Sequence, residues 1–164
     1  MKNLLLIALT LLTICKGINA QVPKAMPPDA DEFYNKSMPL LRSQLKKIVL
    51  QTAETIKHTR IDADSLSNAL HKNASLKGMS NNDIEGMTVL IMVQASKDDD
   101  ADLKKMVMAI SRRSDENNTV AKDNDAESSK LQMIMDRKSG MAEEISYVMK
   151  KISGTQQNII NNLK

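Results

Sequence analysis

Residues 131–163 read LQMIMDRKSGMAEEISYVMKKISGTQQNIINNL, and this stretch decides the fold. Alternating steps of three and four residues select a mostly apolar face, and the opposite face is uniformly polar. The mostly apolar face consists of Leu131, Ile134, Lys138, Met141, Ile145, Val148, Ile152, Thr155, Ile159 and Asn162. The pattern predicts one long amphipathic helix that spans about 50 Å, so its partners must be long helices too. Gly140 and Gly154 inside it either permit close approach of a neighbour or mark flexible points.

The first twenty residues have the composition of a secretory signal peptide. Lys2 precedes an almost unbroken apolar run over residues 4–15, and Ala20 ends a small-residue cleavage sequence. The run is too short to span a bilayer, so we expect no stable membrane insertion after cleavage. Lipidation at Cys15 is the competing interpretation, and it is disfavoured because Ile14 stands where the processing enzyme needs a small side chain. The sequence therefore predicts a secreted or periplasmic protein.

Removal of the signal peptide changes the charge of the chain. Lys2 and Lys16 would leave with it, so the 23 basic and 20 acidic residues of the whole chain would become 21 and 20. This near-neutral balance and an aromatic content of 2% give no support for a nucleic-acid partner. Cys15 is the only cysteine, so we expect a mature protein without thiols, disulfides or thiolate metal sites.

The chain after the signal peptide begins with a proline-rich leader at residues 21–30, which we expect to be extended and flexible. Because proline is tolerated in the first turn of a helix and penalised in its interior, the first helix either kinks at Pro39 or begins there. Gly78 stands where a helix C-terminus prefers glycine. These positions predict a first long helix between the leader and Gly78.

A second helix is predicted from a capping box. Ser80 and Asp83 have the required spacing, and the segment 84–95 that follows is apolar on nearly all sides. This segment is our candidate for the most buried element. Residues 98–102 (DDDAD) then place aspartates on the face that the apolar residues set, so we expect a kink or a restart near residue 97.

Together these patterns predict an all-α fold. We expect an elongated antiparallel bundle of three long helices, roughly 38–77, 81–114 and 120–163, with the middle helix kinked or broken near residue 97. Four helices are the alternative. Residues 31–164 would then form a single helical-bundle domain.

The acidic cluster also raises the question of a calcium site. Asp98, Asp100 and Asp102 match the first three odd positions of an EF-hand loop. The match then fails, because Leu103 occupies the glycine position and Ala109 that of the bidentate glutamate. We therefore interpret the cluster as an acidic helix start rather than a calcium site.

Methionine is unusually common, and four of the twelve form the close pairs Met106/Met108 and Met133/Met135. Thioether clusters in an exported protein raise the possibility of Cu(I) binding. Residues two apart point away from each other on a helix, so neither pair can clamp an ion by itself. We expect these side chains to pack in the core, with an adaptable hydrophobic surface as the second interpretation and metal binding as the third.

No constellation of catalytic residues is visible. His58 and His71 lie on different faces of the expected helix, and His58 with Asp62 offers at most a weak divalent site. The chain also has no Gly-x-Ser-x-Gly turn and no Gly-rich phosphate loop. We therefore expect no catalytic, cofactor-binding or metal-binding residues, no cofactor and no enzyme activity.

Because no catalytic residues are expected, the sequence favours a function in binding. The leading hypothesis is an exported non-enzymatic helical-bundle protein that acts by protein–protein interaction, as an adaptor, a chaperone-like protein or a structural protein. The alternative is a periplasmic small-ligand or metal-binding module that uses a Met-rich core. The partner is expected to be another protein, and self-association stays possible, although packing within the chain is the default.

Overall fold

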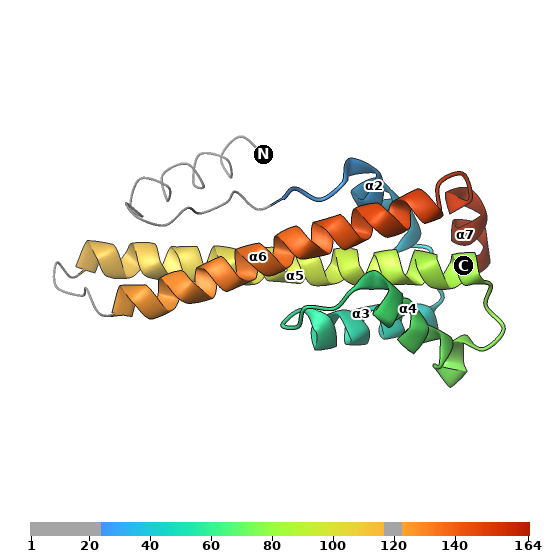
Figure 1. Ribbon diagram of the computed structural model, residues 1–164, viewed down its shortest axis with the longest axis horizontal. Coiled ribbons are helices and arrows are strands. Elements are labelled where there is room, and N and C mark those ends of the chain that lie inside the picture. Colours follow the sequence, from blue (N-terminus) through green and yellow to red (C-terminus); the bar gives the residue numbers. More distant parts are fainter. Residues whose placement is uncertain (1–23, 117–122) are drawn as a thin grey trace.

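The computed structural model describes residues 24–116 and 123–164, with side chains from 24 to 112 and from 127 to 164, and this described part is all-α (Figure 1). The helices are α2 (Pro28–Ser37), α3 (Ser43–Ile56), α4 (Ala63–His71), α5 (Asn81–Glu116), α6 (Asp123–Lys151) and α7 (Gln156–Leu163), with the short 3-10 helix η1 (Ala74–Leu76). No strand occurs within the two ranges. The expected signal peptide and its Cys15 lie outside them.

The long helices α5 and α6 pack against each other as an antiparallel pair, and the shorter helices gather at one end of it (Figure 1). We call this end the body; α2, α3, α4 and α7 each contact α5 there. The rest of the pair projects beyond the body. Among the helices of the described ranges, none is both long and apolar enough to cross a membrane.

The core of the body is organised around the first part of α5. Its residues 84–95 include eight that are fully enclosed: Met87, Thr88, Val89, Leu90, Ile91, Met92, Val93 and Ala95. The prediction that this segment is the most buried is confirmed. The second half of α6 and α7 supply the other side of the core through Met141, Ile145, Val148, Met149, Ile152, Ile159, Ile160 and Leu163.

The predicted first helix over 38–77 is wrong. Helix α2 already begins at Pro28, so the expected flexible leader ends earlier than predicted, and α3 ends at Ile56. Helix α4 then starts separately, because the carboxylate of Asp62 accepts a hydrogen bond from the Ser65 amide at 2.8 Å and caps it. The polar stretch between α3 and α4, where the apolar stripe thins, therefore breaks the predicted helix.

Helix α5 begins as predicted and then departs from the prediction. The capping box is confirmed, since the Asp83 amide donates to Ser80 Oγ at 3.2 Å. However, α5 runs from Asn81 to Glu116 without interruption, so the predicted break near residue 97 is wrong, and Figure 1 shows no sharp kink along α5. The helix continues because the aspartates at 98–102 have hydrogen-bond or ion-pair partners.

The predicted last helix over 120–163 is also wrong. Helix α6 ends at Lys151, and Gly154 has a φ of +84°, a left-handed conformation that glycine adopts without the strain of a Cβ. The chain turns there, and α7 packs on the start of α5. The carbonyl of Leu163 accepts a hydrogen bond from the Arg42 amide at 3.2 Å, which ties α7 to the start of α3.

The close approach of α7 to α5 depends on Gly86, which sequence reasoning did not single out. A Cβ at this position would stand 2.5 Å from Ile159 Cγ2, whereas a Cβ at Gly140 would meet nothing closer than Arg60 Nε at 3.9 Å. We expect Gly86→Ala to lower the free energy of unfolding by about 1–3 kcal/mol through overpacking. Gly140→Ala, the matched control, should raise it by about 0.5–1 kcal/mol through helix propensity. Urea denaturation of both variants checks this, and a stabilising effect at both positions would contradict the close packing.

Candidate functional site

The part of the α5–α6 pair that leaves the body forms a two-helix arm. Asp99 is the last buried residue among the described side chains of α5, and from there to residue 112 every side chain is at least partly exposed. We define the arm as residues 103–116 and 123–136; its side chains are described over 103–112 and 127–136. Figure 1 shows it extending away from α2, α3, α4 and α7.

Apolar side chains form the seam between the two helices of the arm, and this seam is only partly covered. Its partly exposed members are Leu103, Met106, Val107 and Ile110 of α5, and Leu131 and Met135 of α6. Ile134 is the one buried residue among the described side chains of the arm, with 7% of its surface exposed. Two helices cannot enclose an apolar stripe without a third layer, so the seam presents apolar surface to solvent.

The two methionine pairs lie on this arm. Met133 is 62% exposed and Met108 is 47% exposed, while Met106 and Met135 are partly buried. The expectation that these four side chains pack in the core is therefore wrong. It holds for other methionines of the chain, which are buried in the body: Met38, Met87, Met92, Met141 and Met149.

The arm joins the body at a set of ion pairs that we call the collar. Its centre is Asp99, whose carboxylate accepts two hydrogen bonds from Arg137, from Nη2 at 2.9 Å and from Nε at 3.3 Å. The side chain of Asp99 is 1% exposed and that of Arg137 is 11% exposed. Such a bidentate pair fixes both distance and orientation, so it holds α5 and α6 in one register where the arm begins.

Three more aspartates of α5 belong to the collar. Asp100 pairs with Lys138 of α6, and Asp102 lies 3.7 Å from Nζ of Lys57, just after α3, and 3.3 Å from Nζ of Lys105. Asp98 accepts from Gln94 Nε2 at 2.9 Å, and the Gln94 amide oxygen in turn accepts from the hydroxyl of Tyr34 in α2. The collar therefore connects α5 to α2, α3 and α6.

Burial and ion pairing shift the pKa values of the collar carboxylates in opposite directions. Burial raises the pKa of Asp99 above its usual value, against the hydrogen bonds and charge of Arg137. At Asp102, burial also acts upward, but the cations of Lys105 and Lys57 prevail and lower the pKa. The acidic cluster is therefore a mid-helix ion-pair network rather than the predicted helix start, and its partners allow α5 to continue through it.

The calcium interpretation can be compared with this geometry. Asp98, Asp100 and Asp102 lie in a continuous helix, whereas an EF-hand needs a loop that wraps its ligands around the ion. Within the described residues, no three His, Cys, Asp or Glu side chains are grouped so that they could hold a metal ion. Neither observation supports a calcium site at the collar.

Among the residues that the structure describes, neither histidine belongs to a group of metal-ligating side chains, although the charge of His58 acts on Asp99 and Asp102 of the collar to lower the pKa of each. His58 is exposed, and Asp62, its suggested partner in a divalent site, is engaged as the N-cap of α4. His71 is also exposed, and its ring nitrogens lie 2.9 Å from the Ser67 carbonyl and 3.1 Å from Asn81 Oδ1. Both positions have the surroundings of surface residues.

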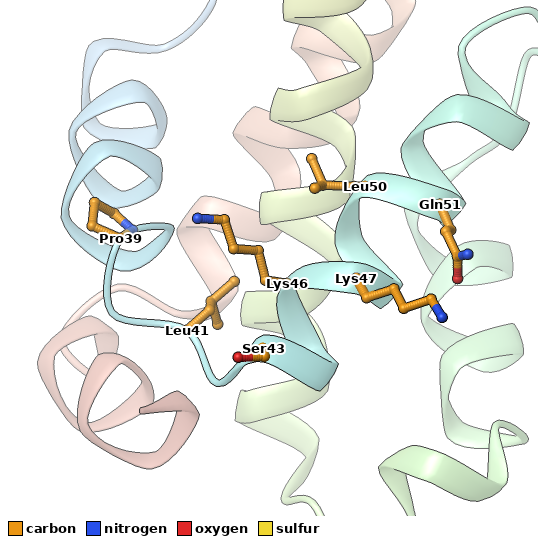
Figure 2. A pocket seen from close by; sticks show the side chains of 7 residues that line it. All are labelled: Pro39, Leu41, Ser43, Lys46, Lys47, Leu50 and Gln51. Carbon is orange, nitrogen blue, oxygen red and sulfur yellow. The ribbon is translucent and has the colours of Figure 1, made fainter.

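An open groove lies on the outer side of α3 in the body (Figure 2). It is lined by Pro39, Leu41, Ser43, Lys46, Lys47, Leu50 and Gln51. Figure 2 shows Lys46 reaching toward Pro39 and Lys47 pointing the other way. The lining offers two ammonium groups and little other polar chemistry, so it has the composition of a solvated helix face.

The fold and the site define an all-α protein with a helical arm. No protein-family model, no curated protein and no solved structure gives a significant match to the chain. The interpretation of its function therefore depends on the geometry of the arm and the body alone.

Proposed function

We propose that this chain is an exported, non-enzymatic protein that acts by protein–protein interaction, and that the arm carries the binding surface. The observation that supports the proposal is the distribution of methionine. The body encloses Met87 and Met92 completely, whereas the arm exposes Met108 and Met133 beside a partly open seam. Apolar surface of this kind is costly to expose, and it is typical of a site that another molecule covers.

The occupant that we propose is an apolar segment of another polypeptide. Methionine has an unbranched, polarisable side chain, so a Met-rich surface adapts to ligands of different shape. The charged residues of the arm three or four positions from the exposed methionines include both signs: Lys104, Lys105 and Arg112 on α5, and Lys130 and Asp136 on α6. A uniformly basic rim would favour an anionic lipid surface, and a mixed rim favours protein.

The collar supports a role as a rigid presenting arm. The pair of Asp99 and Arg137 fixes α5 against α6 where the arm begins, so the exposed methionines keep a defined position. An adaptor, a chaperone-like protein and a structural protein would all use such an arm. We place its site of action in the periplasm or outside the cell, because of the signal-peptide pattern of residues 1–20.

The test is site-specific photo-crosslinking in the envelope of the native host. A photo-reactive phenylalanine analogue replaces Met133 on the arm or, as the matched control, the exposed Asn68 of α4 in the body. We expect a crosslinked protein at Met133, absent at Asn68 and suppressed by excess unlabelled chain. Equal yields at both positions would contradict the assignment of the surface, and crosslinks only to a second copy of the chain would replace the hetero-partner by self-association.

A further inference from the structure

We propose that the methionines of the arm are a site of reversible oxidation by hydroperoxides, and that oxidation converts the apolar arm surface into a polar one. The modification follows from the structure itself. The consequence for a bound partner rests on the proposed function of the arm, since it needs the apolar surface to be the binding surface.

Exposure divides the described methionines into three classes. Met133 and Met108, at 62% and 47%, present their thioethers to a peroxide in solution. Met87 and Met92 are 0% exposed in the centre of the body, so an oxidant reaches them only when the body opens. The partly buried methionines are intermediate in access: Met106 and Met135 on the seam, and Met26 and Met79 against the core of the body. The arm is therefore the part of the described chain where the accessible thioethers concentrate.

The chemistry is a transfer of one oxygen atom. The sulfur lone pair attacks one oxygen of the hydroperoxide, the S–O bond forms as the O–O bond breaks, and the proton of the transferred hydroxyl passes to the departing oxygen. Sulfur loses two electrons and becomes a sulfoxide, while the hydroperoxide is reduced to an alcohol, or hydrogen peroxide to water. With Cys15 in the expected signal peptide, no thiol of the mature chain competes for the oxidant.

We expect oxidation to change the polarity of the arm surface strongly and the stability of the fold little. A sulfoxide is polar and accepts hydrogen bonds, so each conversion removes apolar surface from the arm. The core of the body keeps its thioethers, because Met87 and Met92 are enclosed. Enzymes that reduce methionine sulfoxide return the side chain to the thioether, so the change is reversible.

The first experiment measures where oxygen is incorporated. The folded chain is treated with graded hydrogen peroxide, and sulfoxide is quantified in each peptide by mass spectrometry. We expect Met133 and Met108 to be oxidised first and Met87 and Met92 to be protected by at least about tenfold in rate, since their reaction requires opening. In urea, where the chain is unfolded, we expect Met87 and Met133 to be oxidised at equal rates. Oxidation of Met87 as fast as Met133 in the folded chain would overturn the proposal.

The second experiment measures the surface with 8-anilinonaphthalene-1-sulfonate (ANS), a dye that fluoresces on apolar surface. We expect peroxide to reduce dye fluorescence in the natural chain and to leave it unchanged in a variant with leucine at positions 106, 108, 133 and 135, which conserves the apolar volume. An equal loss of dye fluorescence in both chains would show that the methionines of the arm are not the surface that oxidation changes. If sulfoxide forms as expected but the Met133 crosslink is absent before oxidation, the proposed function fails and the modification site stands.

Discussion

Replacing Ile145 by aspartate is expected to unfold the body. Ile145 is 0% exposed on the face of α6 that packs into the core, so the substitution places a carboxylate among apolar side chains with no cation provided for it. We expect the free energy of unfolding to fall by about 4 kcal/mol or more, a large fraction of the stability of a domain of this size. Thermal and urea denaturation followed by circular dichroism measure the effect.

The control is His58→Ala. His58 is exposed just after α3, and its removal should change the free energy of unfolding by less than about 0.5 kcal/mol. Similar denaturation midpoints for the two variants would show that the face containing Ile145 is not buried.

The burial of Ile145 could be predicted from sequence because it depends on a local pattern. The apolar period that selects Ile145, Val148 and Ile152 is set by the helix itself, and any helix with such a stripe must bury it. The same period continues toward Leu131, where it predicted equal burial, and there the structure leaves the side chain partly exposed. Periodicity shows which face seeks a partner, but not how far along the helix the partner extends.

The ends of the helices were predicted less well because they depend on contacts between distant segments. Gly154 was expected to permit close approach or to mark a flexible point within one long helix, whereas it is the left-handed turn residue from which α7 folds back on α5. The true close approach lies at Gly86, opposite Ile159, seventy-three positions further along the chain by their residue numbers. No local pattern links these two positions.

The methionine pairs and the aspartate cluster show the same limit. Met106 and Met133 resemble core residues as long as a third helix is assumed to cover them, and the structure places none of the described helices there. The aspartates at 98–102 conflict with a buried face until Arg137 and Lys138 are brought opposite them. A signal was available in the spacing, because residues paired across an antiparallel hairpin stand at similar distances on either side of its turn. Asp99 and Arg137 both lie 19 residues from position 118, between the predicted helices 81–114 and 120–163.

Replacing Arg137 by methionine is expected to be the other strongly destabilising change. It keeps most of the aliphatic volume but removes both hydrogen bonds to Asp99, whose side chain is 1% exposed. A buried carboxylate without its partner is far costlier than the pair was favourable, so we expect a loss of about 3–5 kcal/mol in the free energy of unfolding. Urea denaturation at neutral pH measures it.

Two controls separate the buried charge from other effects. The double variant Asp99→Leu/Arg137→Met removes both charges and should recover most of the loss, because an apolar pair often replaces a buried ion pair without penalty. Lys36→Met breaks an exposed ion pair in which Lys36 Nζ lies 2.6 Å from Glu32 Oε1. This change should lower the free energy of unfolding by less than about 1 kcal/mol. A double variant as unstable as Arg137→Met alone would mean that Arg137 acts through packing rather than through the carboxylate.

The pH dependence of the same variant gives an independent test of the mechanism. Burial raises the pKa of Asp99 above its usual value of 3.8, and loss of Arg137 should raise it further, since the partner that favours the charged form is gone. A carboxyl whose pKa is higher in the folded than in the unfolded chain favours folding when it is protonated, and this advantage is lost as the pH rises from the unfolded pKa through the folded one. The deficit of Arg137→Met relative to the natural chain should therefore shrink as the pH falls toward 4. A deficit that is constant between pH 4 and pH 8 would show that Asp99 does not carry a buried charge in the variant.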